Sequence, residues 1–184
     1  SYMKVNSYRF RYGLQIFHTF GEHRFAIGGI FENKMPLRST YTVMESSLLD
    51  TITTYPNDEH PNPFEMPMIY GGGLSYSWAN RLTVAFDYSR ECMASARYFD
   101  QVGQLNNRDR YALGVEYMNN PHSNKYIDHV QWRMGLNISD HYATQLANLK
   151  NITASIGVGL PLRNAGTVFN ASLEYTHAGT KTFL

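Results

Sequence analysis

The sequence contains a single cysteine, Cys92, so it cannot form an internal disulfide. It has no run of about 18 apolar residues, which a membrane-crossing helix would need. Neither charge is in excess, with 16 Lys and Arg against 15 Asp and Glu, and no basic run carries interleaved aromatics. These absences argue against a disulfide scaffold, a helical membrane protein and a nucleic-acid-binding surface.

Aromatic residues and glycine are abundant. The 184 residues include 14 Tyr, 10 Phe, 2 Trp and 14 Gly, while the hydrophobic fraction is an ordinary 43%. Tyrosine has an apolar ring and a polar tip, so it suits a boundary between lipid and water. This composition favours a membrane β-barrel over a soluble helical protein.

Apolar and polar side chains alternate through most of the chain. Residues 8–16 place aromatic and aliphatic side chains on one face and Arg9, Arg11 and Gln15 on the other. The same alternation recurs in segments 25–32, 70–78, 82–89, 110–117, 129–138, 152–160 and 169–175. Successive strand residues point to opposite faces, and strands of roughly 9–11 residues cross a membrane. The pattern predicts an all-β, antiparallel, up-and-down transmembrane β-barrel with eight main strands in this chain.

The connections between these segments alternate between short and long. Long excursions fall near residues 33–67, 90–108 and 139–150, and we expect all three on the outer side of the membrane. Within the first, residues 41–55 are rich in Thr and Ser and are expected to form a short extra hairpin or strand. We find no linker, so residues 1–184 are expected to form a single domain.

The two faces of the predicted strands differ in character. The apolar face carries aromatics near strand ends, as in the girdles that flank a lipid-facing belt: Tyr8, Phe31, Tyr70, Trp78, Tyr88, Tyr117 and Tyr175. The polar face mixes Gly, Ser and Ala with charged residues that we expect to face the lumen: Arg9, Arg11, Asp87, Arg110, Glu116, Arg133 and Glu174. These charges form either a paired network that stiffens the wall, which we favour, or a polar path.

The strands must close into a barrel in hydrocarbon, because an open edge would leave backbone groups unpaired. Bacterial outer-membrane barrels usually end in a strand with a terminal aromatic, whereas residues 177–184 follow the last predicted strand and look like a loop. We therefore expect the eight strands to be part of a larger barrel, and the alternative is that the eight close alone, with side chains filling the middle. A soluble β-barrel or sandwich, with the apolar face turned inward, remains the alternative.

Some segments resemble a known family. Residues 155–162 (SIGVGLPL) with 169–175 (FNASLEY), Met66-Pro67 before 70–76 (YGGGLSY), and 111–117 (YALGVEY) are similar to strands of FadL-type long-chain fatty-acid transporters of Bacteroidota. The resemblance covers residues 65–177. It implies a barrel of about fourteen strands in the outer membrane of a Gram-negative bacterium, and uptake of hydrophobic small molecules. The plug of that family has no counterpart here, and no ligand-contacting residue carries over.

The expected partners are therefore the lipid bilayer and, for a transporter, a hydrophobic small-molecule ligand. A second hypothesis is a structural barrel that docks other outer-membrane proteins without transport. A catalytic, metal or cofactor site is not expected. His122, His129 and His141 match no compact metal motif, and Asp58-Glu59-His60 suits a solvated loop. Asp128 and His129 are adjacent, so in a strand they would point to opposite faces and could not cooperate.

Overall fold

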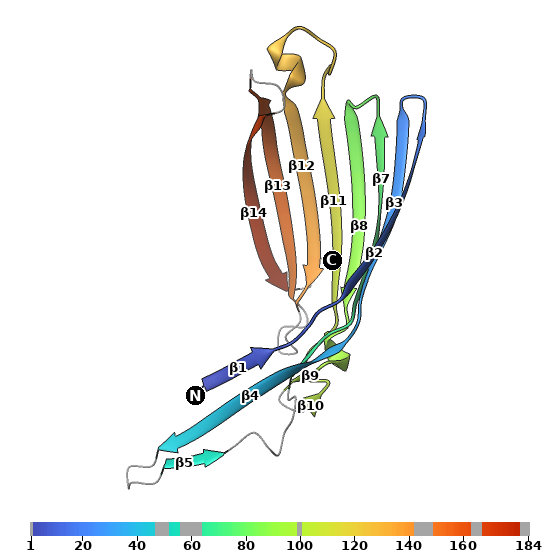
Figure 1. Ribbon diagram of the computed structural model, residues 1–184. Coiled ribbons are helices and arrows are strands. Elements are labelled where there is room, and N and C mark those ends of the chain that lie inside the picture. Colours follow the sequence, from blue (N-terminus) through green and yellow to red (C-terminus); the bar gives the residue numbers. More distant parts are fainter. Residues whose placement is uncertain are drawn as a thin grey trace.

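The computed structural model describes residues 2–46, 52–55, 64–98, 101–141, 149–162 and 167–180. Antiparallel strands make up nearly all of these residues, and they contain no α-helix, only two short 3-10 turns, η2 (Met93–Ser95) and η3 (Tyr126–His129). The strands form an eight-stranded sheet and a smaller second sheet (Figure 1). The prediction of an all-β fold is confirmed.

The eight-stranded sheet, here called the wall, contains the predicted main strands. In spatial order it consists of β2 (Arg11–Phe20), β3 (His23–Glu32), β7 (Ile69–Trp78), β8 (Leu82–Glu91), β11 (Arg108–Met118), β12 (Gln131–Asp140), β13 (Leu149–Pro161) and β14 (Val168–Thr180). Spatial neighbours follow chain order, as expected of an up-and-down topology. Among the described residues, β2 and β14 each keep one edge without a partner strand, so closure into a barrel stays a prediction.

The second sheet corrects the prediction that residues 33–67 form one long loop. It contains β1 (Tyr2–Asn6), β4 (Met35–Ser46), β5 (Ile52–Tyr55), β6 (Phe64–Met66), β9 (Arg97–Tyr98) and β10 (Gln101–Val102). Part of the sequence pattern was hidden by Pro36, which lies near the start of β4, a position that proline tolerates. β4 and β5 pair from Val43 with Tyr55 to Ser46 with Ile52, which confirms the extra hairpin.

The ends of the wall differ, as the rhythm of the connections predicted. The short turns between β2 and β3 and between β7 and β8 lie at one end, together with the η3 connection between β11 and β12 (Figure 1). The second sheet lies beyond the opposite end. The expected excursion at 90–108 is shorter than predicted and contributes η2, β9 and β10. In the expected excursion at 139–150, β12 reaches Asp140 and β13 begins at Leu149, while residues 142–148 lie outside the described part.

The apolar side chains do not gather into a dry core. Ala96 and Val130 are the buried hydrophobic residues of the described chain. By contrast, Tyr12, Leu74 and Ile156 keep 62%, 56% and 59% of their surface exposed. A soluble sandwich would bury these side chains first, so the exposed apolar face favours the membrane alternative.

Candidate functional site: the polar face of the wall and the second sheet

The strand register places the predicted charged residues on a common face of the wall. Glu116 lies opposite Arg133, Asp87 lies opposite Gly73 and Ala112, and Glu174 lies opposite Ser155. Arg110 pairs in register with Ser89 and Ser139, and Arg11 with Glu32. Cross-strand partners share a face, so a continuous polar face runs from β2 to β14. The wall begins at Arg11, so Arg9 lies just before β2 rather than in it.

The polar face is the less exposed side of the wall. Along β7 and β12 the polar-face positions are half-buried or buried, whereas most apolar-face positions are exposed. β3 and β13 follow the same trend. A curved sheet crowds the side chains on its concave side, and the small Gly and Ser residues of this face reduce that crowding. On these four strands the polar face is therefore the more crowded side, as expected of the concave side of a curved wall, and we call it the inner face.

Two rows that are rich in aromatic residues lie on the apolar face, one over β2, β3 and β7 and the other from β2 to β12. Tyr12, Phe31 and Tyr70 align at the end nearer the second sheet. The second row lies near the tight turns and contains Phe20, His23, Trp78, Leu82, Tyr117 and Trp132. Tyr70 and Trp78 are eight positions apart, so at about 3.3 Å per residue the rows lie about 26 Å apart along the strand. Outer-membrane strands are tilted by about 35–45°, so this separation corresponds to about 20 Å along the membrane normal, against an apolar band of roughly 25 Å.

The predicted girdle residues do not all belong to these rows. Tyr175 pairs with Ala154, which places it between the two rows. Tyr8 precedes β2. Tyr88 lies two register pairs inward from Tyr70 and packs against Tyr111, with 5.0 Å between ring centroids. Alternation identified the face correctly, but only the register shows the height of each ring on the wall.

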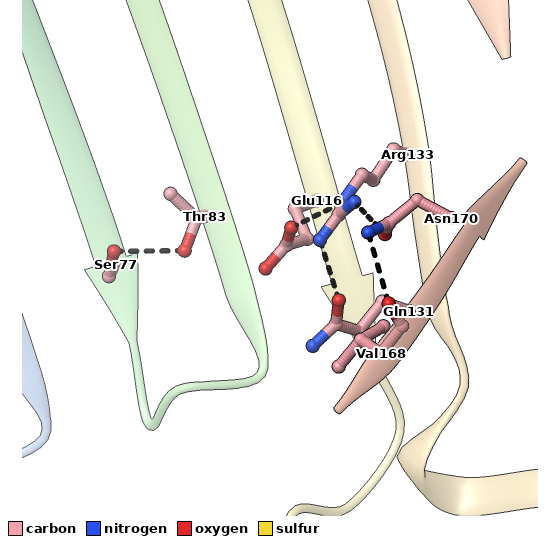
Figure 2. A network of polar contacts seen from close by, with 7 residues as sticks. All are labelled: Ser77, Thr83, Glu116, Gln131, Arg133, Val168 and Asn170. Carbon is pink, nitrogen blue, oxygen red and sulfur yellow. Dashed lines mark hydrogen bonds and ion pairs between the residues drawn. The ribbon is translucent and has the colours of Figure 1, made fainter. Parts of the chain in front are cut away.

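Glu116 and Arg133 form the centre of a polar network on the inner face (Figure 2). Arg133 Nε donates to Glu116 Oε2 at 2.7 Å, Nη1 donates to Asn170 Oδ1 at 2.6 Å and Nη2 donates to Gln131 Oε1 at 2.6 Å. These bonds connect β11, β12 and β14. On β7 and β8, Ser77 and Thr83 share a hydroxyl hydrogen bond of 2.9 Å. The guanidinium therefore ties neighbouring strands together at the end of the wall near the tight turns.

Glu32 was not among the predicted site residues, yet it is the most buried charged side chain of the described chain. Its carboxylate is 1% exposed and accepts hydrogen bonds from both Arg9 and Arg11. The sequence did carry a signal, because Glu32 falls on the polar face of the strand after Arg11. Two guanidinium groups around one buried carboxylate join the chain entering β2 to the end of β3.

Asp87, Arg110 and Glu174 behave differently from the other predicted residues. All three side chains are exposed, and no ion pair or hydrogen bond to them occurs within the described ranges. The other predicted charges are ion-paired: Arg9 and Arg11 with Glu32, and Arg133 with Glu116. Near the second sheet, Arg108 also pairs with Glu91. The inner face thus contains a paired set and an unpaired set of charges.

A second charged cluster, which sequence reasoning missed, lies where the second sheet meets the wall. Lys34 Nζ is 2.7 Å from Glu65 Oε2 and donates to the Ser95 carbonyl at 2.7 Å. The Arg97 backbone N–H donates to Glu65 at 2.9 Å. Burial raises the pKa of Glu65, but the Lys34 hydrogen bond, the Arg97 N–H and both positive charges outweigh it, so its pKa is lowered. Phe64 and Tyr98 stack edge to face beside it.

The connection between β11 and β12 is held by its own polar groups. Asn119 and Ser123 donate hydrogen bonds to Asp128, and these two bonds lower its pKa. His129 was predicted in a strand but lies in η3, with a ring nitrogen on the Ser123 carbonyl. His141 follows β12 at the opposite end of the wall. In the described part of the chain, no three His, Cys, Asp or Glu side chains gather as metal ligands would, and residues 58–60 lie outside it.

Comparison with known families identifies the chain. The sequence matches the BamG family over residues 4–183. The chain belongs to the BamG family. This family is associated with the BAM complex, the outer-membrane assembly complex of Gram-negative bacteria. The match gives no support to the resemblance to FadL-type transporters. No curated protein and no solved structure matches the chain.

The structure agrees with an outer-membrane setting for a BamG-family protein. Among the described residues no helix is both long and apolar enough for a membrane span. The exposed apolar face and its two aromatic rows instead belong to antiparallel strands.

Proposed function

We propose that this BamG-family chain is an outer-membrane β-wall that docks partner proteins of the BAM complex and does not transport small molecules. The observation that carries the proposal is the family match over residues 4–183. The role involves no catalytic step, metal or cofactor. It corresponds to the docking hypothesis rather than to uptake of a hydrophobic ligand.

The apolar face of the wall is proposed to contact lipid. Two observations support this orientation. The large apolar side chains are exposed, and many of them lie between two aromatic rows, as in the lipid-facing belt of an outer-membrane barrel. The concave polar face then lines the interior, where its ion pairs limit the cost of enclosing charge.

The inner face suits a scaffold better than a path for hydrophobic compounds. A route for such compounds would need an apolar lining. The groove that β2, β3, β7, β8 and β11 line on this face is mixed, with Asp87, Arg110 and polar side chains among glycines, alanines and the aliphatic residues Leu14, Ile30 and Leu74. Nearby, Arg133 crosses between strands and binds Glu116, Gln131 and Asn170. These contacts support a stiff wall.

The second sheet is proposed as the docking surface. It extends beyond the end of the wall, as Figure 1 shows for β1 and β4. The cluster of Lys34, Glu65 and Arg97 holds β6 against β9 at the base of the second sheet. Tyr98 and Val102 are exposed on the β9–β10 hairpin, whose outer strand β10 has no further strand beside it in the described sheet. An exposed strand edge with apolar side chains can pair with a partner.

The proposal is tested by co-purification with the BAM complex from detergent-solubilised outer membranes. We expect the intact chain to co-purify. The variant Val102→Asp with Tyr98→Asp should reduce co-purification at least about fivefold, because charge on an apolar edge opposes docking. Leu162→Asp, which alters an exposed apolar residue outside the second sheet, is the matched control.

Two outcomes would contradict the docking role. One is uptake of a hydrophobic fluorescent compound that depends on the chain while the BAM complex purifies without it. The other is full co-purification of the Val102 and Tyr98 variant. Outer-membrane insertion of every variant is checked by protease protection, so that loss of docking is not confused with loss of folding.

A further inference from the structure

The inner face contains a groove that the proposed docking role does not use. It has a volume of about 560 Å³, and its lining comes from β2, β3, β7, β8 and β11. Neighbouring strands are about 4.8 Å apart, so five strands give the groove a span of about 19 Å. A shallow site of this length fits an elongated ligand better than a compact one.

Small residues form much of the floor of the groove, beside larger side chains such as Gln15 and Ile30. Gly13, Gly28, Gly71 and Gly73 lie on it, with Ala85 and Ala112 beside them. At Gly71 an added Cβ would lie 2.7 Å from the Tyr88 carbonyl oxygen, and at Gly73 it would lie 2.0 Å from Asp87 Oδ1. Packing against β8 therefore accounts for glycine at both positions. At Gly13 the nearest atom would be 3.8 Å away, so the chain's own packing does not require glycine there. Small side chains leave the strand backbone open to close approach.

Two unpaired opposite charges lie in this groove. Asp87 and Arg110 both line it, both are exposed, and neither has an ion pair or hydrogen bond within the described residues. Elsewhere on this face Glu32, Glu91 and Glu116 each have an arginine partner. The groove is thus the part of the inner wall where both a free carboxylate and a free guanidinium are available to a ligand.

Their spacing suits an extended polypeptide. Asp87 lies opposite Ala112, and Ser89 lies opposite Arg110, so the two charged residues are diagonal neighbours on β8 and β11. Diagonal neighbours are about 7–8 Å apart, close to the roughly 6.7 Å between same-face residues of an extended chain. A neutral glycan could hydrogen-bond to both groups but would leave their charges uncompensated, whereas a peptide with a basic and an acidic residue two positions apart complements them.

We propose that this groove binds an extended polypeptide segment of a partner protein, with a basic side chain on Asp87 and an acidic side chain on Arg110. The glycine floor lets the peptide backbone approach the wall. This site is separate from the second sheet, so it extends the proposed function and does not depend on where the BAM complex docks.

The test uses the full chain extracted in detergent and a fluorescein-labelled peptide of repeated Ser-Lys-Ser-Glu, about twelve residues long. We expect saturable binding by fluorescence anisotropy that weakens as salt is added. Asp87→Asn and Arg110→Gln should each weaken binding about tenfold, because each removes a charge-assisted contact. Glu174→Gln removes an exposed, unpaired carboxylate from the same face outside the groove, and it should change binding less than about twofold.

The proposal is overturned if no saturable binding occurs up to about 1 mM peptide, as for a water-filled groove. It is equally overturned if Glu174→Gln weakens binding as much as the groove variants, or if a neutral oligosaccharide competes. Thermal unfolding of each variant is measured to check that the fold is intact. Co-purification of the groove variants with the BAM complex keeps the two proposals distinguishable, since loss of peptide binding with retained co-purification overturns only the groove.

Discussion

At the scale of single residues, the effect of a charge depends on whether the fold gives it a partner. Glu32 and Glu174 both lie on the polar face, but Glu32 is buried beneath Arg9 and Arg11 while Glu174 is exposed on β14. Removing one partner from a buried pair leaves the other charges without compensation, whereas an exposed and unpaired carboxylate contributes little.

We therefore expect Glu32→Gln to lower the free energy of unfolding by about 2 kcal/mol, a value discounted because both arginines are partly exposed. Glu174→Gln should change it by less than about 0.5 kcal/mol. Urea-induced unfolding in detergent, followed by circular dichroism, measures both. Equal effects of the two substitutions would show that Glu32 is not a structural anchor.

At the scale of elements, the tight turns depend on backbone conformations that the sequence predicts only in part. Gly21 has φ of +57°, which glycine adopts at no steric cost. Ala79 and Asn80 have φ of +51° and +53°, the pattern of a type I′ turn, in which alanine is unfavourable. The β7–β8 turn therefore carries a local strain that the paired strands on either side hold in place.

Ala79→Gly should relieve that strain and stabilise the protein by about 1 kcal/mol. The control is Ala85→Gly, in the interior of β8, which should destabilise it by about 0.5–1 kcal/mol. Thermal unfolding scans measure both changes. A fall in the melting temperature for Ala79→Gly would mean that the turn adopts another conformation.

The loop between β11 and β12 should respond to acid. The Ser123 and Asn119 hydrogen bonds hold the pKa of Asp128 below its ordinary value, so ionised Asp128 is favoured in the folded loop. Its contribution is complete above the ordinary carboxyl pKa and is lost as the pH falls through the lowered folded value. The protection factors of the backbone amides of residues 119–130, which are corrected for the pH dependence of intrinsic exchange, should therefore fall in acid, and in Asp128→Asn they should be low and much less dependent on pH.

At the scale of the whole molecule, substitutions on the two faces of the edge strand β14 distinguish a wall in a membrane from a sheet in water. Leu173 is 69% exposed, and its neighbour Glu174 is exposed on the opposite face. In water both positions would accept arginine. If the apolar face contacts lipid, a charge there is costly, while the inner face tolerates it.

We expect Leu173→Arg to destabilise the protein in lipid vesicles by about 2–4 kcal/mol and to reduce insertion, while Glu174→Arg has little effect. Urea titration of vesicle-inserted protein measures the difference. Equal tolerance of both arginines would place the apolar face of β14 in water or against protein.

The sequence alone was sufficient for the repeating part of the fold. Strict alternation identified all eight wall strands, their order and their two faces, because side-chain direction reverses at every strand residue whatever the tertiary context. It also predicted which charges share a face. It did not predict β1, β6, β9, β10 or the first half of β4, whose short segments are interrupted by proline or lack clear alternation.

The tertiary structure decided how those residues act. Curvature made the polar face the crowded side, and register put Glu32 beneath two arginines and Arg133 beside Glu116, while Asp87 and Arg110 stayed unpaired. Ion pairing between side chains depends on which strands are neighbours and on the register between them. These long-range relations are absent from a local pattern of period two, which fixes only the direction of each side chain.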